Sequence, residues 1–211
     1  MTMQRRAFLS LLPAAGLSAC GNMLGPPHAG TIYVMKPRFT APAAPSAAAP
    51  LPKAAWALSV MRPDCPGSLD TDRIALIKPD GTMDYYANAA YPDRLPQLVQ
   101  TALIDAIEAG GRIGQVAREQ DALHADYALF TEIKDFEAHY VGAAPEVRVT
   151  LAAKLATSHG RIIVANMVAS HTVPAGADSV GAVTGALESG LGAAASEIAA
   201  WVGGFPPPPT P

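Results

Sequence analysis

The sequence predicts an α/β domain in which a mixed, largely antiparallel sheet packs with two helices; an α+β sandwich is the alternative. Three observations support this prediction. The turn signal Pro-Asp-Gly at 79–81 lies between two apolar runs, which is typical of a β-hairpin. Two long segments, 93–111 and 178–203, repeat apolar residues at helical spacing. Between them, residues 147–155 alternate apolar and polar side chains, as a half-buried antiparallel strand does.

The N-terminal part of the domain supplies the first strands. Residues 31–35 are a short apolar run that ends before a proline, which predicts a strand at the edge of a sheet. A second strand is expected at 55–61, before a turn that contains proline and glycine. The two flanks of the hairpin turn, 73–77 and 83–86, are the next strands.

The first helix is predicted from Asp93 to the glycine pair at 110–111. Asp93 is a favourable N-cap residue, Pro96 fits the first turn, and the glycines allow a left-handed stop. The apolar residues form one stripe that is expected to pack against the sheet. They are Leu95, Leu98, Val99, Ala102, Leu103, Ala106 and Ile107.

Four strands are expected after this helix, beginning with a short one at 113–118. The strand predicted at 127–140 changes its apolar phase in the middle, which indicates a bulge or a strong twist. The alternating strand at 147–155 turns at 159–160 into a strand at 161–172. The first half of this last strand is apolar at nearly every position, so we expect it inside the sheet with both faces covered.

The second helix is predicted to begin at Asp178 or Ser179 and to end near Val202. Four glycines inside it each lower helix propensity by roughly 1 kcal/mol relative to alanine. Close packing on the sheet is expected to compensate for this cost. The glycines are Gly181, Gly185, Gly190 and Gly192.

Residues 1–19 have the features of a lipoprotein signal peptide. Arg5 and Arg6 precede an apolar run at 7–17, which is shorter than the roughly 20 residues that span a bilayer. The run ends in Leu-Ser-Ala-Cys, the pattern cut by lipoprotein signal peptidase, so we expect fatty acyl chains such as palmitate on Cys20. The arginine pair leaves both the twin-arginine and the general secretory export routes open.

The mature chain is predicted to contain one domain, at 31–202, with a tether before it and a tail after it. Residues 20–30 are predicted to be a flexible tether, and 40–53 an Ala/Pro-rich loop within the domain. The Pro-rich tail at 203–211 is either a frayed end or a docking peptide.

Composition excludes several classes of partner and chemistry. The 211 residues carry a net charge of −3, which gives no basic excess for nucleic acid. With Cys20 acylated, Cys65 has no intrachain disulfide partner, and we interpret it as an incidental loop cysteine. The five histidines lack the close spacing common in metal sites, and no nucleophile, base and orienting group can be assembled. We therefore expect no catalytic residue, no metal and no cofactor, and the chain is predicted not to be an enzyme.

Several separated segments resemble the ABC-type transport auxiliary lipoproteins, and the resemblance covers residues 31–202. The most specific part is Leu69-Asp70-Thr71-Asp72-Arg73-Ile74-Ala75, followed by Met83-Asp84-Tyr85-Tyr86. The other matching segments are Tyr33-Val34-Met35, Pro66-Gly67-Ser68, Ala87-Asn88-Ala89, Asp93-Arg94-Leu95-Pro96, Asp126-Tyr127 and Asp135-Phe136-Glu137-Ala138.

This resemblance implies a fold similar to the N-terminal domain of TolB and an anchor in the outer membrane, on the periplasmic side. Gly21 after Cys20 agrees with that location under the sorting rule of enterobacteria. The implied partners are a substrate-binding protein of the mammalian-cell-entry (MCE) type, a permease and an ATPase, which together move lipids or other apolar compounds. A homo-oligomer is left open.

Two functions follow from these expectations. In the first, the domain docks on an MCE assembly through an exposed patch of Tyr85, Tyr86, Tyr91 and Arg94, because aromatic and arginine side chains carry much interface energy. The alternative for these residues is core packing of the tyrosines and a solvated charge at Arg94. In the second function, the domain is a periplasmic carrier that encloses a lipid.

Overall fold

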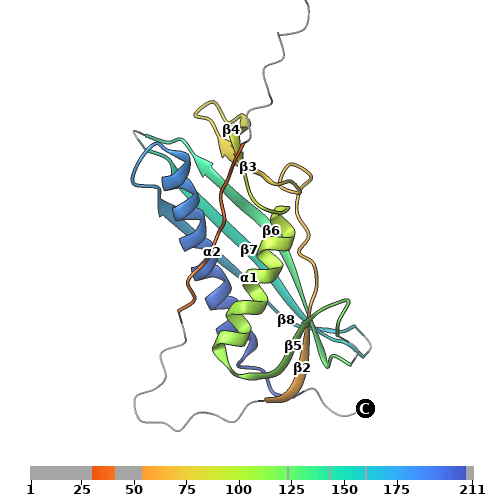
Figure 1. The fold of residues 1–211 in the computed structure, drawn as a ribbon. Coiled ribbons are helices and arrows are strands. Elements are labelled where there is room, and N and C mark those ends of the chain that lie inside the picture. The colour runs from red at the N-terminus through yellow and green to blue at the C-terminus, as the bar shows by residue number, and fades with distance from the viewer. Residues whose placement is uncertain (1–29, 41–53, 123, 143, 160, 208–211) are drawn as a thin grey trace, which may run out of the picture.

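The computed structural model describes residues 30–40, 54–122, 124–142, 144–159 and 161–207. Within these residues the chain forms one mixed sheet of eight strands and two helices, which confirms the predicted fold class (Figure 1). The helices are α1 (Leu95–Gly110) and α2 (Val180–Val202). The strands are β1 (Thr31–Ile32), β2 (Ala54–Val60), β3 (Arg73–Ile77), β4 (Met83–Ala90), β5 (Ile113–Arg118), β6 (Tyr127–His139), β7 (Glu146–Thr157) and β8 (Ile163–Pro174).

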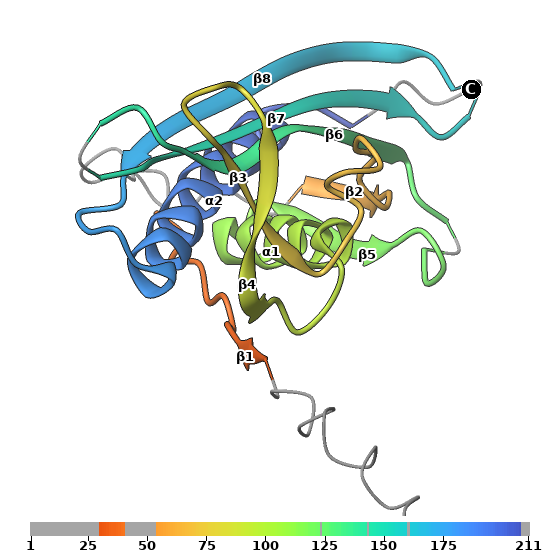
Figure 2. The same ribbon diagram turned by 90° about the horizontal axis from the view of Figure 1, so that it is seen from above.

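The long strand β6 organises the sheet. One side of β6 pairs along its length with β7, whereas the other side pairs with β2 near its start and with β3 near its end. The strands β6, β7 and β8 form an antiparallel meander, and β3 and β4 form the predicted hairpin with Gly81 at φ 83°. The β1–β4, β2–β5, β2–β6 and β3–β6 pairs are parallel. Both helices lie on the same face of the sheet (Figure 2).

The predicted phase change in β6 is a break in its register with β7 between Ile133 and Asp135. Because the break shifts the alternation by one residue, Ile133 and Phe136 both face the core, with 0% and 1% of their surface exposed. The predicted bulge is therefore confirmed.

The helix ends agree with the sequence except at the start of α1. Gly111 ends α1 in the left-handed region with φ 63°, and the Ser179 hydroxyl accepts a hydrogen bond from Ala182 N–H at the start of α2. Asp93, however, is not the N-cap of α1. Arg94 occupies that position without a side-chain cap, and the Leu95 N–H instead donates to the Thr71 carbonyl at 2.9 Å. Among the described residues, no helix combines the length and the apolarity needed to cross a bilayer.

The prediction for the last strand is wrong. Among the described strands, β8 lies at the edge of the sheet and pairs only with β7, and α2 covers one of its faces while the other is open (Figure 2). Val164 and Val168 on the open face are 44% and 57% exposed. An unbroken apolar run is typical of a strand with both faces covered, but here one set of alternating residues faces α2 and the other faces solvent.

Residues 33–40 form a strap that crosses the helices after β1 (Figure 1). The Lys36 N–H donates to the Glu188 carboxylate, and the Thr40 N–H donates to the Ser196 hydroxyl. The strap lies so close to α2 that a Cβ on Gly192 would be 2.5 Å from the Arg38 carbonyl oxygen. Gly190 likewise permits α2 to approach β7, because its Cβ would be 2.9 Å from a methyl group of Val149.

Substitution of Gly192 by alanine is expected to displace this strap. The backbone contact should lower the free energy of unfolding by about 1–3 kcal/mol, the usual cost of overpacking, despite the better helix propensity of alanine. Gly185 is the matched control, because nothing lies within 4 Å of its added Cβ, and Gly185→Ala should raise stability by up to about 1 kcal/mol. Urea denaturation measures both values. A stabilising Gly192→Ala would contradict the docked position of the strap.

Candidate functional site

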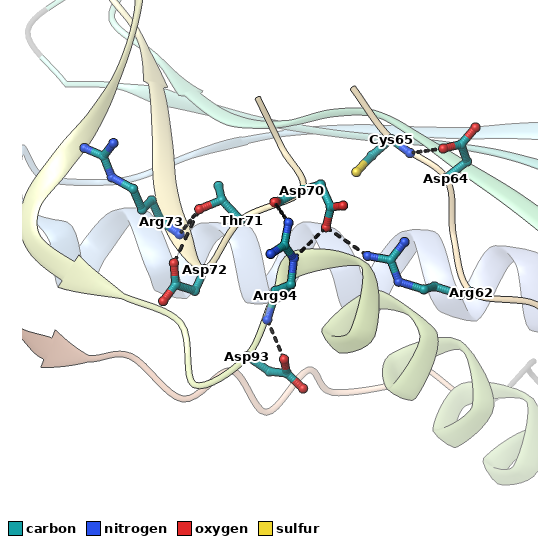
Figure 3. Close-up of polar contacts among 9 residues, drawn as sticks. All are labelled: Arg62, Asp64, Cys65, Asp70, Thr71, Asp72, Arg73, Asp93 and Arg94. Atoms are coloured by element: carbon teal, nitrogen blue, oxygen red, sulfur yellow. Dashed lines mark hydrogen bonds and ion pairs between the residues drawn. The ribbon is translucent and has the colours of Figure 1, made fainter. Parts of the chain in front are cut away.

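The segment between β2 and β3 carries most of the polar residues near the start of α1 (Figure 3). It is fixed to β6 by two backbone hydrogen bonds, from Asp64 N–H to the Thr131 carbonyl at 2.9 Å and from Ile133 N–H to the Asp64 carbonyl at 2.8 Å. These bonds extend the sheet past the end of β2. As a result, the turn at 66–72 lies beside the N-terminus of α1.

Asp70 lies between two arginines in this turn (Figure 3). Its Oδ1 atom accepts hydrogen bonds from an Arg62 terminal nitrogen at 2.8 Å and from Arg94 Nε at 2.9 Å. Arg94 also donates to the backbone carbonyl of Asp70. We call Arg62, Asp70 and Arg94 the arginine cluster.

The arginine cluster lies at the surface. The Arg94 and Arg62 side chains are 54% and 40% exposed, and the Asp70 side chain is 32% exposed. The hydrogen bond from Arg94 is the main cause that lowers the pKa of the Asp70 carboxyl, which is therefore ionised at neutral pH. Exposed ion pairs contribute little to stability, because water and salt screen them. The main effect of the cluster is therefore to hold two guanidinium groups in place at the surface.

Tyr85 on β4 supports the same turn. Its hydroxyl donates to the Ser68 carbonyl at 2.9 Å, and the Arg73 guanidinium lies 4.0 Å from the centre of its ring. Tyr85 is partly buried. The structure thus brings Tyr85 and Arg94 to the same turn.

Tyr86 lies on the opposite face of β4 from Tyr85, because successive strand residues alternate. Its hydroxyl is 3.0 Å from the Tyr140 hydroxyl, which donates to the Asp178 carboxylate at 2.7 Å. Burial is the main cause that raises the pKa of Tyr86, and the hydrogen bond to Tyr140 adds to it. Tyr86 therefore links the hairpin to the start of α2 and does not contribute to the arginine cluster.

Tyr91 belongs to the core, which corrects the expectation of an exposed residue. Only 2% of its surface is exposed, and its ring packs edge-on against Phe136 with the ring centres 6.3 Å apart. Burial raises the pKa of its hydroxyl, which has no hydrogen-bond partner among the described residues. Of the four proposed patch residues, Tyr85 and Arg94 remain as a surface pair.

Sequence reasoning missed Asp70 and Arg62 as members of the site. Residues 70–73 have the composition of a turn that hydrogen-bonds its own backbone, and Thr71 Oγ1 accepts from Arg73 N–H at 3.3 Å. The ion pairs of Asp70 depend on residues brought close by the fold. The sequence shows an acidic residue, Asp70, with several arginines nearby in the chain. This pattern does not tell which arginines form ion pairs with Asp70.

Cys65 lies beside the arginine cluster and is partly buried (Figure 3). Burial, and then the nearby Asp70 carboxylate, raise the pKa of its thiol. The thiol is therefore protonated at neutral pH, which agrees with the interpretation as an incidental cysteine. Cys20 and the tether up to residue 29 lie outside the described residues.

A metal site or a lipid cavity would indicate a different function for the described residues. They contain no group of three or more His, Cys, Asp and Glu side chains that could hold a metal ion. A hollow of about 460 Å³ lies beside β2, β6 and the segment between β7 and β8. Its lining includes Glu119, His159 and Arg161, and charged or ionisable groups do not suit an acyl chain.

The tail begins by packing against the domain. Phe205 lies edge-on to Trp201 with ring centres 5.3 Å apart, and the Tyr127 hydroxyl donates to the Pro206 carbonyl at 3.2 Å. Residues 208–211 and most of the Ala/Pro-rich loop, 41–53, lie outside the described residues.

Comparison with known proteins identifies the family of this chain. The model of a family described as "ABC-type transport auxiliary lipoprotein component" matches residues 38–199. Because this match covers more than half of the chain, the protein belongs to the family of ABC-type transport auxiliary lipoproteins. The family is an accessory component of transport systems.

Individual proteins are similar to this chain in sequence or in fold. Protein XCC0632 from Xanthomonas campestris has a crystal structure that matches with a TM-score of 0.73 and 27% identity, over 82% of this chain and 94% of that chain. Protein CT253 from Chlamydia trachomatis shares the fold alone, with a TM-score of 0.51 and 8% identity over 73% and 98% of the two chains. The uncharacterized protein bll6063 from Bradyrhizobium diazoefficiens is 26% identical over 187 residues, 89% of this chain and 48% of that protein. The chain thus spans about half the length of this curated relative.

Proposed function

We propose that this protein is the accessory lipoprotein of an MCE-type ABC transport system. Acyl chains on Cys20 hold it at the outer membrane with its domain in the periplasm. The domain docks on the MCE-type substrate-binding protein, which works with a permease and an ATPase to move lipids or other apolar compounds. The family membership and the exposed arginines of the described surface support this proposal.

The arginine cluster is the observation that carries the docking function. Arg94 and Arg62 are exposed arginines held in fixed positions by Asp70, with Tyr85 beside them. Side chains of this kind dominate interface energy, and a fixed side chain loses less conformational entropy on binding than a mobile one. A carrier function is not proposed, because the hollow beside β2 places Glu119, His159 and Arg161 among its apolar lining residues.

Co-purification with the MCE protein tests this function. Arg94→Ala in the full-length lipoprotein is expected to reduce recovery of the MCE protein from detergent-solubilised membranes about tenfold, which corresponds to about 1.4 kcal/mol. Arg148→Ala is the matched control, because Arg148 is an exposed arginine on β7, away from the cluster.

The partner is identified by mass spectrometry, and thermal unfolding verifies that both variants fold. Because exposed ion pairs add little stability, Arg94→Ala should melt close to wild type. Recovery of the MCE protein at the wild-type level with Arg94→Ala would exclude the cluster as the docking site. Absence of an MCE protein from the wild-type preparation would contradict the proposed function itself.

A further inference from the structure

The end of the β7–β8 hairpin carries an exposed apolar group that the proposed function does not use. Ile162, Ile163 and Val164 follow one another in the chain and are 65%, 57% and 44% exposed, so no described segment covers them. We call these three residues the apolar tip. Figure 2 shows this end of the hairpin beyond both helices, near the start of β6.

Hydrogen bonds hold the apolar tip in place. The Thr157 N–H donates to the Ile162 carbonyl at 2.9 Å, and the Ile162 N–H donates to the Thr157 hydroxyl at 3.3 Å. The Ser158 N–H donates to the Asp126 carbonyl at 2.9 Å, which fixes the hairpin end to the residue before β6. The exposure of the three aliphatic side chains is therefore a property of a hydrogen-bonded turn and not of a loose loop.

Groups that can donate to a phosphate lie next to the apolar tip. Arg161 directly precedes it and lines the hollow of about 460 Å³ beside β2, together with His124 and His159. A guanidinium is always charged, and an imidazole keeps one N–H donor even when it is neutral. Glu119 also lines the hollow, but its Oε2 atom already accepts a hydrogen bond from Gln100 Nε2 at 2.6 Å. Aliphatic side chains with such donors at their base are complementary to a phospholipid surface, where phosphates lie above acyl chains.

A protein partner suits the apolar tip less well than a bilayer. Interface hot spots are enriched in Trp, Tyr and Arg, whereas Leu and Val are under-represented. The apolar tip has only branched aliphatic side chains, and it forms the protruding end of a hairpin. Insertion into lipid needs no matching shape, because its strength depends on the apolar area that leaves water and on attraction to anionic lipids.

We propose that the apolar tip inserts into the surface of a phospholipid bilayer while Arg161 binds lipid phosphate beside it. Three aliphatic side chains bury less apolar area than one acyl chain, whose own binding is reversible, so half-saturation is expected on the order of millimolar lipid. The contact therefore does not by itself retain the chain in a membrane fraction. Under the proposed function it is a second attachment point besides Cys20, and two attachment points restrict the orientation of a domain more than one does.

Vesicle binding by the chain from Gly21 to Pro211, which lacks the acylated cysteine, tests the proposal. Co-sedimentation with sucrose-loaded vesicles of phosphatidylethanolamine and phosphatidylglycerol measures the bound fraction as the lipid concentration rises. Replacement of both Ile162 and Ile163 by serine should weaken binding at least about tenfold, because it removes most of the apolar area. Val141→Ser is the matched control, since Val141 is a 69% exposed valine beyond the other end of β6, and it should bind as wild type does.

The contribution of Arg161 is measured with the same vesicles. Arg161→Gln should weaken binding about fivefold, the usual effect of one cation near an anionic surface. Arg148→Gln, at an exposed arginine on β7, should leave binding unchanged. Thermal unfolding verifies that every variant is folded.

A wild-type chain that does not bind vesicles would overturn the proposal, as would a folded serine variant that binds as wild type does. Unchanged binding by Arg161→Gln would exclude its role at the phosphate. None of these results depends on recovery of the MCE protein by the acylated chain, so the two proposals fail separately.

A fluorophore reports whether the apolar tip enters the acyl region. In the same chain with Cys65→Ser, Ile163→Cys labelled with an environment-sensitive dye should be quenched by lipids that carry a nitroxide on the acyl chain. The same dye at Val141→Cys should not be quenched. Quenching at 141 without quenching at 163 would show that the opposite end of the sheet contacts the bilayer and would exclude the proposed insertion.

Discussion

Replacement of Tyr91 by alanine is expected to lower the free energy of unfolding by about 3–5 kcal/mol, the range for loss of a buried aromatic side chain. The ring is 2% exposed and packs edge-on against Phe136. The loss combines the transfer free energy of the ring with the cavity that remains. Urea denaturation of the purified protein measures the change, with an unchanged m value as evidence that the unfolded state is the same.

Tyr91→Phe is the matched variant, because it keeps the ring and removes only the hydroxyl. This hydroxyl has no partner among the described residues, so its removal should raise stability by about 1 kcal/mol. Both variants should bind the MCE protein as wild type does when they are folded. An alanine variant that is as stable as wild type but no longer binds the MCE protein would show that Tyr91 contributes to the interface and not to the core.

Elements whose signals are local in sequence could be predicted. The hairpin between β3 and β4 depends on the turn residues 79–81, and the end of α1 depends on Gly111, which adopts a positive φ of 63°. The bulge in β6 follows from the apolar phase of its own residues. In each case the residues that fix the geometry are within a few positions of the element.

Features that depend on distant residues could not be predicted. An apolar run such as the first half of β8 does not indicate whether a second layer covers it, and here α2 covers one face only. Arg94 and Asp70 are 24 residues apart in the chain, and their contact requires the turn at 66–72 to lie against α1. Similarly, the aromatic character of Tyr91 suits both a core and an interface, and only the position of Phe136 distinguishes them.

Under the proposed function the location of the domain depends on Cys20, and substitution of this residue is expected to abolish acylation. In cells labelled with palmitate, the wild-type protein should carry the label and Cys20→Ser should carry none. The chain offers a matched control in Cys65→Ser, which should be labelled fully, because Cys65 has a protonated and partly buried thiol and lies outside the signal-peptide pattern.

A protein without the palmitate label should also lose its attachment to the membrane. Each buried CH₂ group contributes about 0.8 kcal/mol, so several acyl chains hold a protein firmly whereas a single chain binds reversibly. When a cleavable secretory signal without a cysteine replaces residues 1–20, the protein should move from the membrane fraction to the soluble periplasmic fraction. The arginine cluster would remain intact in this form but would no longer be concentrated at the membrane, so recovery of the MCE protein should also fall. A label that persists in Cys20→Ser, or is lost in Cys65→Ser, would show that the anchor is not at Cys20.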